Sequence, residues 1–85
     1  MKPIVYKGSY FIIIESNQEN KKTNIYYIYT DEDKEVLLGK IKWYGPWRKY
    51  CFYPEDNIVW DNKCLTELVE YLNELNYEYK HKKEE

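Results

Sequence analysis

The stretch VLLGKIKWYGPWRKYCFYP, residues 36–54, decides the fold because it predicts two strands joined by a tight turn. Residues 36–44 alternate along a strand: one face receives Leu37, Gly39, Ile41 and Trp43, and the other receives Lys40, Lys42 and Tyr44. Gly45-Pro46 is a turn signal, and residues 47–53 form the returning strand, which Pro54 ends. Gly39 interrupts the row of side chains and indicates a bulge or a close backbone contact.

Two further strands are predicted before this hairpin. Residues 10–14 form a continuous apolar run, which is typical of a central strand. Residues 25–30 alternate, with Ile25, Tyr27 and Tyr29 on one face. The polar residues 16–23 are expected to be a hairpin loop and the charged residues 31–34 a turn. Residues 58–60 add either a short fifth strand or a tucked connection.

The last predicted element is a helix with one apolar stripe. The residues at helical spacing are Leu65, Leu68, Val69, Leu72, Leu75 and Tyr79. Asp61 or Asn62 can cap the helix by accepting hydrogen bonds from its first backbone N–H groups. The stripe must be buried, and the sheet is the element that can cover it. The sequence therefore predicts an α+β fold, a four- to five-stranded antiparallel β-meander with one C-terminal α-helix packed on one face.

Length and composition indicate one small folded domain. The 85 residues are too few for two cores of about 50 residues each. An aromatic content of 19% argues against disorder, although the mean hydropathy is −0.87. We expect residues 1–80 to form the domain and residues 81–85 to be a charged tail that frays. Without a long apolar run or a signal peptide, the chain is expected to stay in the cytoplasm and to have no membrane partner.

The sequence carries no recognisable set of catalytic or metal-ligating residues. Glycine-rich phosphate-binding motifs and the nucleophile-elbow motif are absent, and the one histidine, His81, lies in the charged tail. Cys51 and Cys64 lack metal-ligand spacing, and we interpret them as two buried free thiols, with a disulfide as the alternative. We therefore expect a protein that is not an enzyme and that has no cofactor and no metal.

Charge is segregated along the chain, although the formal net charge is only −2. Residues 36–54 carry four cations and no acid, whereas residues 55–79 carry a net charge of −6. Cations that interleave with aromatic rings suit a ligand whose base stacks while its phosphate is held. Arg48 offers a planar fork for phosphate or carboxylate, and its structural alternative is a partner such as Glu55 or Asp56. The predicted ligand-binding residues are Trp43, Tyr44, Trp47, Arg48, Lys40, Lys42, Lys49 and Tyr50.

This basic aromatic patch also has a purely structural interpretation. Alternation along a strand sends half of the rings toward the helix as core, and lysines on an outward strand face are ordinary solvation. The pairs Tyr26-Tyr27 and Tyr77/Tyr79 are likewise favoured as half-buried core rather than as a ligand site. At the level of the sequence both interpretations of the patch stay open.

Residues 38–54, followed by Cys64-Leu65 at the start of the helix, resemble small uncharacterised proteins of phage and mobile-element genomes. The shared pattern is L-G-x-I-x-W-Y-x-x-W-R-x-Y-x-F-x-P, then C-L and an amphipathic helix, and it covers residues 37–75. The resemblance implies a genomic setting, and with it the cytoplasm of a host bacterium, but no mechanism.

Three functions follow as hypotheses. The first is a non-catalytic binding protein that antagonises a bacterial defence system by sequestering a nucleotide-derived signal, with a homodimer or higher homo-oligomer supplying a pocket. The second is an inhibitor or adaptor that docks on a host protein through its aromatic hairpin or acidic helix. The third is binding of single-stranded nucleic acid, which the neighbouring acidic segment disfavours.

Overall fold

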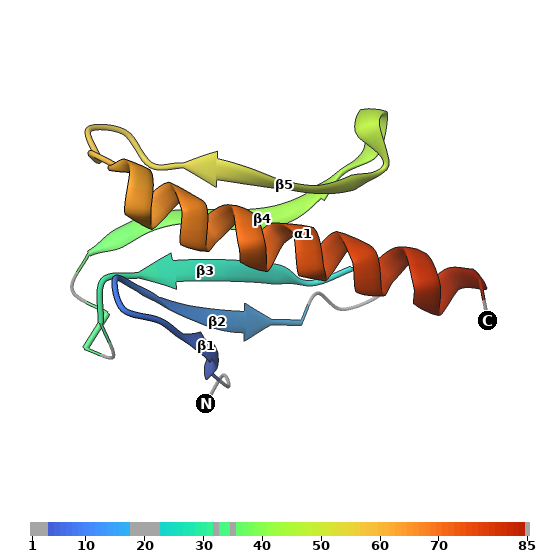
Figure 1. The fold of residues 1–85 in the computed structure, drawn as a ribbon, viewed down its shortest axis with the longest axis horizontal. Coiled ribbons are helices and arrows are strands. Elements are labelled where there is room, and N and C mark those ends of the chain that lie inside the picture. Colours follow the sequence, from blue (N-terminus) through green and yellow to red (C-terminus); the bar gives the residue numbers. More distant parts are fainter. Residues whose placement is uncertain (1–3, 18–22, 32, 35, 85) are drawn as a thin grey trace.

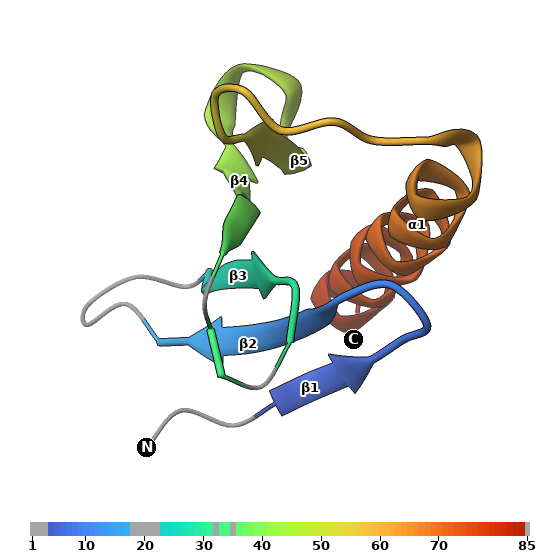
Figure 2. The same cartoon turned by 90° about the vertical axis from the view of Figure 1, so that its left-hand side faces the viewer.

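The computed structural model describes residues 4–17, 23–31, 33–34 and 36–84, and Figure 1 shows their arrangement. The elements are β1 (Ile4–Lys7), β2 (Ile12–Ser16), β3 (Ile25–Tyr29), β4 (Leu37–Tyr44), a 3-10 turn (Gly45–Trp47), β5 (Lys49–Pro54) and α1 (Asn62–Glu84). All neighbouring strands pair antiparallel in the order β1-β2-β3-β4-β5, and α1 crosses one face of the sheet. In the end-on view of Figure 2 the sheet curls toward the helix. The predicted α+β meander with one C-terminal helix is confirmed.

The fifth strand lies at the N-terminal end of the sheet, in β1. The β-branched residues Ile4 and Val5 suit such an extended edge. Residues 58–60 are a connection without strand pairing, in which Trp60 packs edge-on against Phe11 and Phe52, with ring centroids 6.0 and 5.2 Å away. Of the two alternatives predicted for residues 58–60, the structure shows the tucked connection and not the strand, because the Trp60 ring closes the core beside the helix.

Two sequence predictions fall partly outside the described residues. Of the predicted loop at 16–23, Ser16 belongs to β2 and residues 18–22 are not described. Of the predicted turn at 31–34, residue 32 is not described, and the Lys34 N–H donates to the Asp31 carbonyl at 3.1 Å. The strand predicted at 10–14 begins at Ile12, because the preceding residues close the β1–β2 turn, where the Gly8 N–H donates to the Phe11 carbonyl at 2.9 Å.

The hydrophobic core lies between α1 and the sheet. Its buried members are Phe11, Ile13, Tyr26, Ile28, Ile41, Tyr50 and Leu68. Strand register brings the sheet members into rows, such as Ile13 opposite Ile28 and Tyr26 opposite Ile41. The alternation predicted for residues 25–30 is confirmed, because Tyr26 and Ile28 are buried while Tyr27 and Tyr29 are only half-buried on the other face.

A bulge corrects one predicted face of β4. Ile28 pairs with Gly39, but the next residue of β3, Tyr29, pairs with Leu37, so that Leu38 is the additional residue. Leu37 consequently faces away from Gly39, and Leu38 packs on the core in its place. The predicted close contact at Gly39 is confirmed: a Cβ there would lie 2.6 Å from the Phe52 ring.

The helix begins where the sequence places it, but its buried side is rotated. The Cys64 N–H donates to Asp61 Oδ1 at 2.8 Å, so Asp61 is the cap. Leu68 is buried, whereas Leu65 and Val69 remain 42% and 50% exposed, and the predicted stripe is wrong at these two positions. The ring of Tyr71 takes up the space over β1 and β3, with centroids 5.3 Å from Tyr6 and 6.4 Å from Tyr26, which turns the buried side toward those strands.

At its C-terminal end the helix continues through Glu84, beyond the domain boundary predicted at residue 80. No helix in the described part of the chain is both long enough and apolar enough to cross a lipid bilayer.

Candidate functional site: the open face of the sheet

The sheet has a second face, on the side away from α1, which no described helix covers (Figures 1 and 2). We call it the open face. Strand register places one continuous row across it, and this row consists of Ile4, Ile14, Tyr27, Lys40 and Tyr53. Neighbouring positions on the same face are Lys7, Ile12, Ser16, Ile25, Tyr29, Leu37, Lys42, Tyr44, Lys49 and Cys51.

The open face has an apolar half and a basic half. Over β2, Ile12 and Ile14 are each only 3% exposed, and their register neighbours on β3 are Tyr29 and Tyr27. Over β4 and β5 the side chains are mainly lysines and tyrosines, with Lys40 opposite Tyr53. The basic half of the face therefore offers aromatic rings beside cations.

Carboxylates are absent from the strand positions of this face. Glu15 is the one acid within the five strands, and it lies on the helix side, where it accepts hydrogen bonds from Asn24 Nδ2 at 2.6 Å and from the Tyr26 hydroxyl at 3.2 Å. The cations on the basic half of the open face are Lys40, Lys42 and Lys49, and Lys7 lies at the β1 edge, where it lines a cleft with Glu67 and Glu70. Because the strands place no carboxylate beside Lys40, Lys42 and Lys49, the basic half attracts anions.

Cations and rings contact each other on the basic half. Lys42 Nζ lies 5.0 Å from the centroid of the Tyr53 ring, and Lys49 Nζ lies 5.8 Å from that of Trp47. Tyr44 and Trp47 meet nearly perpendicular, with centroids 5.1 Å apart and planes at 83°. Trp47 is 65% exposed, so much of its ring surface is available for stacking.

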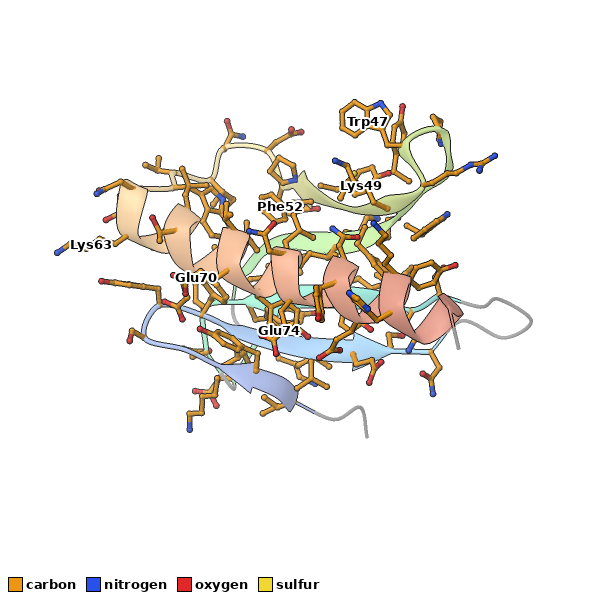
Figure 3. The ribbon with its side chains drawn as sticks, turned by 45° about the vertical axis from the view of Figure 1, so that its right-hand side comes forward. Trp47, Lys49, Phe52, Lys63, Glu70 and Glu74 are labelled. Atoms are coloured by element: carbon orange, nitrogen blue, oxygen red, sulfur yellow. The ribbon has the colours of Figure 1, made fainter. Side chains whose placement is uncertain are left out.

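The turn between β4 and β5 positions Trp47 and Arg48. Gly45–Trp47 form one 3-10 turn, and Arg48 closes it in the left-handed conformation at φ 51°, with its N–H donating to the Gly45 carbonyl at 3.1 Å. Arg48 is exposed. Trp47 and Lys49 project from this end of the molecule, whereas Glu70 and Glu74 project from α1 on the side of β1 and β2 (Figure 3).

The structure divides the eight predicted ligand-binding residues between two faces. Lys40, Lys42, Tyr44 and Lys49 lie on the open face, and Trp47 and Arg48 lie in the adjoining turn. Trp43 and Tyr50 lie on the helix side, because strand alternation gives them the same face as Ile41. The Trp43 ring packs 4.5 Å from Tyr79 and 5.5 Å from Tyr50, and Tyr50 is buried, so these two rings belong to the core.

Some residues of the open face are not among the ligand-binding residues predicted from the sequence. Tyr27 and Tyr29 come from β3, Tyr53 from β5 and Lys7 from β1, so they adjoin the patch only through strand pairing. The alternation of Ile25, Tyr27 and Tyr29 was the available signal. This alternation indicates a binding residue only once β3 is known to pair with β4, because the pairing brings Tyr27 beside Lys40.

Two clefts lie on the helix side. The larger, about 710 Å³, is lined by two carboxylates, Glu67 and Glu70, by two lysines, Lys7 and Lys63, and by the β1–β2 turn. The smaller, about 290 Å³, is acidic, because Glu15, Glu74 and Glu78 line it together with Tyr26 and Tyr71. Burial, with smaller contributions from Glu15, Glu78 and Glu74, raises the pKa of Tyr71 to about 12. The carboxylates of the smaller cleft repel phosphates, so this cleft is a poor place for a nucleotide.

The two cysteines are free, which corrects the disulfide alternative. Both are half-buried rather than fully buried. Cys51 lies on the open face opposite Lys42, whereas Cys64 lies in the first turn of α1. Burial, and then the hydrogen bond to Asp61, raise the pKa of the Cys64 thiol. Among the described residues, no group of three or more His, Cys, Asp or Glu side chains is placed to hold a metal ion.

The fold and this face define a small α+β protein with a basic, tyrosine-rich sheet surface. The chain is similar to an uncharacterised 9.3 kDa protein of Acholeplasma phage L2, with 46% identity over 50 residues. The match covers 59% of this chain and 64% of that relative, which is less than two thirds of the relative's length. It confirms the resemblance to a small uncharacterised phage protein, while the residue pattern described above stays a prediction. No protein-family model matches the chain, and no solved structure matches it significantly.

Proposed function

We propose that this protein is a non-catalytic binding protein that captures a nucleotide-like anion on the open face. The observation that carries the proposal is the segregation of Lys40, Lys42 and Lys49 with exposed or half-exposed rings on a face whose strand positions include no carboxylate. Rings stack on bases and ammonium groups attract phosphates, so one surface serves both parts of a nucleotide.

A phage setting gives this binding activity a plausible use. The similarity to a phage protein supports expression in the cytoplasm of an infected bacterium. There a small protein that holds a nucleotide-derived signal would lower its free concentration and so antagonise a defence system that depends on it. A homodimer or higher homo-oligomer would add enclosure, which the outer surface of a sheet on a single 85-residue chain does not offer.

The two cysteines allow a direct test by thiol footprinting. The protein is treated with a maleimide alone, then with adenosine monophosphate, a cyclic dinucleotide or a mixed-sequence oligonucleotide, and modification is followed by mass spectrometry. A ligand on the open face slows modification of Cys51 and leaves that of Cys64 unchanged, because Cys64 lies on α1.

Calorimetric titration of the same probes provides the second readout. Lys40→Ala and Lys42→Ala weaken binding, whereas Lys63→Ala at the far end of α1 does not (Figure 3). Absence of binding by all three probes would show that the open face does not take nucleotide-like anions.

Docking on a host protein is the second candidate. It is favoured by apolar side chains that the fold leaves exposed, namely Trp47, Leu65, Val69 and the 94% exposed Val59. Large exposed apolar side chains are frequent at protein interfaces. Affinity capture with the wild type and with Trp47→Ala and Val69→Asp would supply the partner and show which surface it contacts.

A further inference from the structure

We infer that the ligand of the open face is an extended single-stranded nucleic acid that contacts two separate ring-and-cation stations. This inference rests on the function proposed above and specifies its ligand. The first station consists of Tyr27, Lys40 and Tyr53, and the second of Tyr44, Trp47 and Lys49.

The first station is built across three strands. Tyr27 on β3 pairs with Lys40 on β4, and Lys40 pairs with Tyr53 on β5, so the Cα atom of the lysine lies between those of the two tyrosines, about 5 Å from each. Lys42 Nζ, 5.0 Å from the Tyr53 centroid, adds a second cation beside the same ring. A base stacked here would have its phosphate within reach of two ammonium groups.

The second station lies at the other end of the hairpin. Tyr44 pairs with Lys49, Trp47 contacts the Tyr44 ring edge-on at 5.1 Å, and Lys49 Nζ lies 5.8 Å from the Trp47 centroid. This station repeats the chemistry of the first, with the lysine on β5 and the tyrosine on β4 instead of the reverse.

The distance between the stations sets the size of the ligand. Lys40 and Tyr44 are four residues apart on one strand, which corresponds to about 13 Å at 3.3 Å per residue. Lys42, opposite Cys51, lies midway and is placed to meet the phosphates that connect two bases. A single nucleotide cannot occupy both stations, whereas an extended strand can run along β4 from one station to the other.

The acidic segment lies next to the basic segment in the sequence, and this proximity disfavours binding of nucleic acid. In the fold the two segments lie on different elements. The residues Glu67, Glu70, Glu74 and Glu78 all lie on α1, which covers the other side of the sheet. Glu67 and Glu70 line a cleft beside β1 that includes Lys7, and Glu74 and Glu78 line one beside Val5 and Glu15; Figure 3 shows Glu70 and Glu74 on α1. The sheet therefore separates these carboxylates from the basic half of the open face, over β4 and β5.

A length series tests this inference. Binding of adenosine monophosphate, a cyclic dinucleotide, and mixed-sequence di-, tetra- and octanucleotides of DNA and RNA is measured by calorimetry at low salt. We expect the affinity to rise steeply from the mononucleotide to the tetranucleotide. Tyr53→Ala and Tyr44→Ala should each weaken octanucleotide binding by about 5-fold or more, because stacking on each station is lost.

Matched variants separate stacking, charge and folding. Tyr53→Phe keeps the ring and should bind the octanucleotide almost as well as the wild type. Lys40→Ala and Lys49→Ala should each lower the salt dependence of binding, by about 0.7 in the slope of log K against log salt concentration. Lys63→Ala, on α1, should leave this slope unchanged.

The outcomes distinguish the inference from the function on which it rests. If the mononucleotide or the cyclic dinucleotide binds as tightly as the octanucleotide, or if only one station responds to mutation, the two-station inference is wrong and nucleotide capture stands. If none of the probes binds, both fail.

Discussion

The two faces of the sheet come from the same strands but are under different physical demands. Along β4, Ile41 is fully buried against the core, while its neighbours Lys40 and Lys42 lie on the open face. A residue on the helix side is fixed by packing, because its volume must match those of its neighbours. A residue on the basic half of the open face has no such constraint. Its chemistry is therefore the better guide to function.

The largest expected effect is at the centre of the helix side. Ile41→Ala should lower the free energy of unfolding by about 3 kcal/mol, because it leaves a cavity under α1 that the surrounding side chains cannot fill. Urea denaturation followed by circular dichroism measures the change. Lys42→Ala, one residue away on the open face, is the control, with an expected change of about 0.5 kcal/mol or less. Equal losses in the two variants would contradict the difference between the faces.

A slightly smaller loss is expected at Gly39, where the helix side tolerates no side chain. An added Cβ would lie 2.6 Å from Phe52 Cε1 and 2.8 Å from the Tyr53 carbonyl oxygen. Gly39→Ala should therefore cost about 1–3 kcal/mol of stability through overpacking. Gly45→Ala is the matched control, because nothing lies within 4 Å of its Cβ position. An unchanged free energy of unfolding in Gly39→Ala would contradict this expectation, and it would mean that β5 can shift to make room for the added methyl group.

The next largest loss of stability is expected at the edge strand β5, where Asn76 of α1 binds the backbone of Tyr50. The Tyr50 N–H donates to Asn76 Oδ1 at 2.7 Å, and Asn76 Nδ2 donates to the Tyr50 carbonyl at 3.2 Å. One helix side chain thus satisfies both backbone groups of Tyr50, which would otherwise be open to another strand. Asn76→Ala should cost about 1–2 kcal/mol and promote self-association. Light scattering and denaturation would be compared with Asn73→Ala, which alters an exposed position of the same helix.

The smallest expected effect is a loss of stability at high pH, which arises on the helix side. Burial, together with the hydrogen bond to Glu67, raises the pKa of Tyr6 to about 12, and burial raises that of Tyr71 to about 12. The phenolate is thus less stable in the folded state than in the unfolded chain, where tyrosine titrates near pH 10. The tyrosine contribution to stability is complete below about pH 10 and is lost as the pH rises toward about 12.

Denaturation at about pH 9 and about pH 11 measures this loss. Burial also raises the pKa of Tyr26 and of Tyr50. Tyr71→Phe removes one of these tyrosines and should flatten the dependence on pH. An unchanged slope in Tyr71→Phe would show that the Tyr71 phenol does not contribute to the loss of stability at high pH.

The sequence predicts most of the strands and the helix because their signals are local. Alternation identifies β3 and β4, Gly45-Pro46 marks the turn, and Asp61 caps α1 as expected. The errors occur where distant residues decide. The bulge at Leu38 depends on pairing with β3, and the exposure of Leu65 and Val69 depends on how Tyr71 packs over β1.

In the candidate site, too, the local signals were predicted correctly and the contacts between distant residues were not. Six of the eight predicted residues lie on the open face or in its turn, because charge and strand alternation can be read along the chain. Trp43 and Tyr50 were included because they are close in sequence, although they pack under α1. Tyr27 and Tyr53 were omitted because they join Lys40 only through pairing across three strands.

The sequence by itself determined the elements, their antiparallel connections and the segregation of positive charge into residues 36–54. These properties depend on period, turn chemistry and composition, all of which act between near neighbours. Only the tertiary structure decided which side of the sheet the helix covers, and hence which rings became core and which remained beside lysines. That choice is made by packing between residues far apart in the chain, such as Leu68 and Ile41, which share one core.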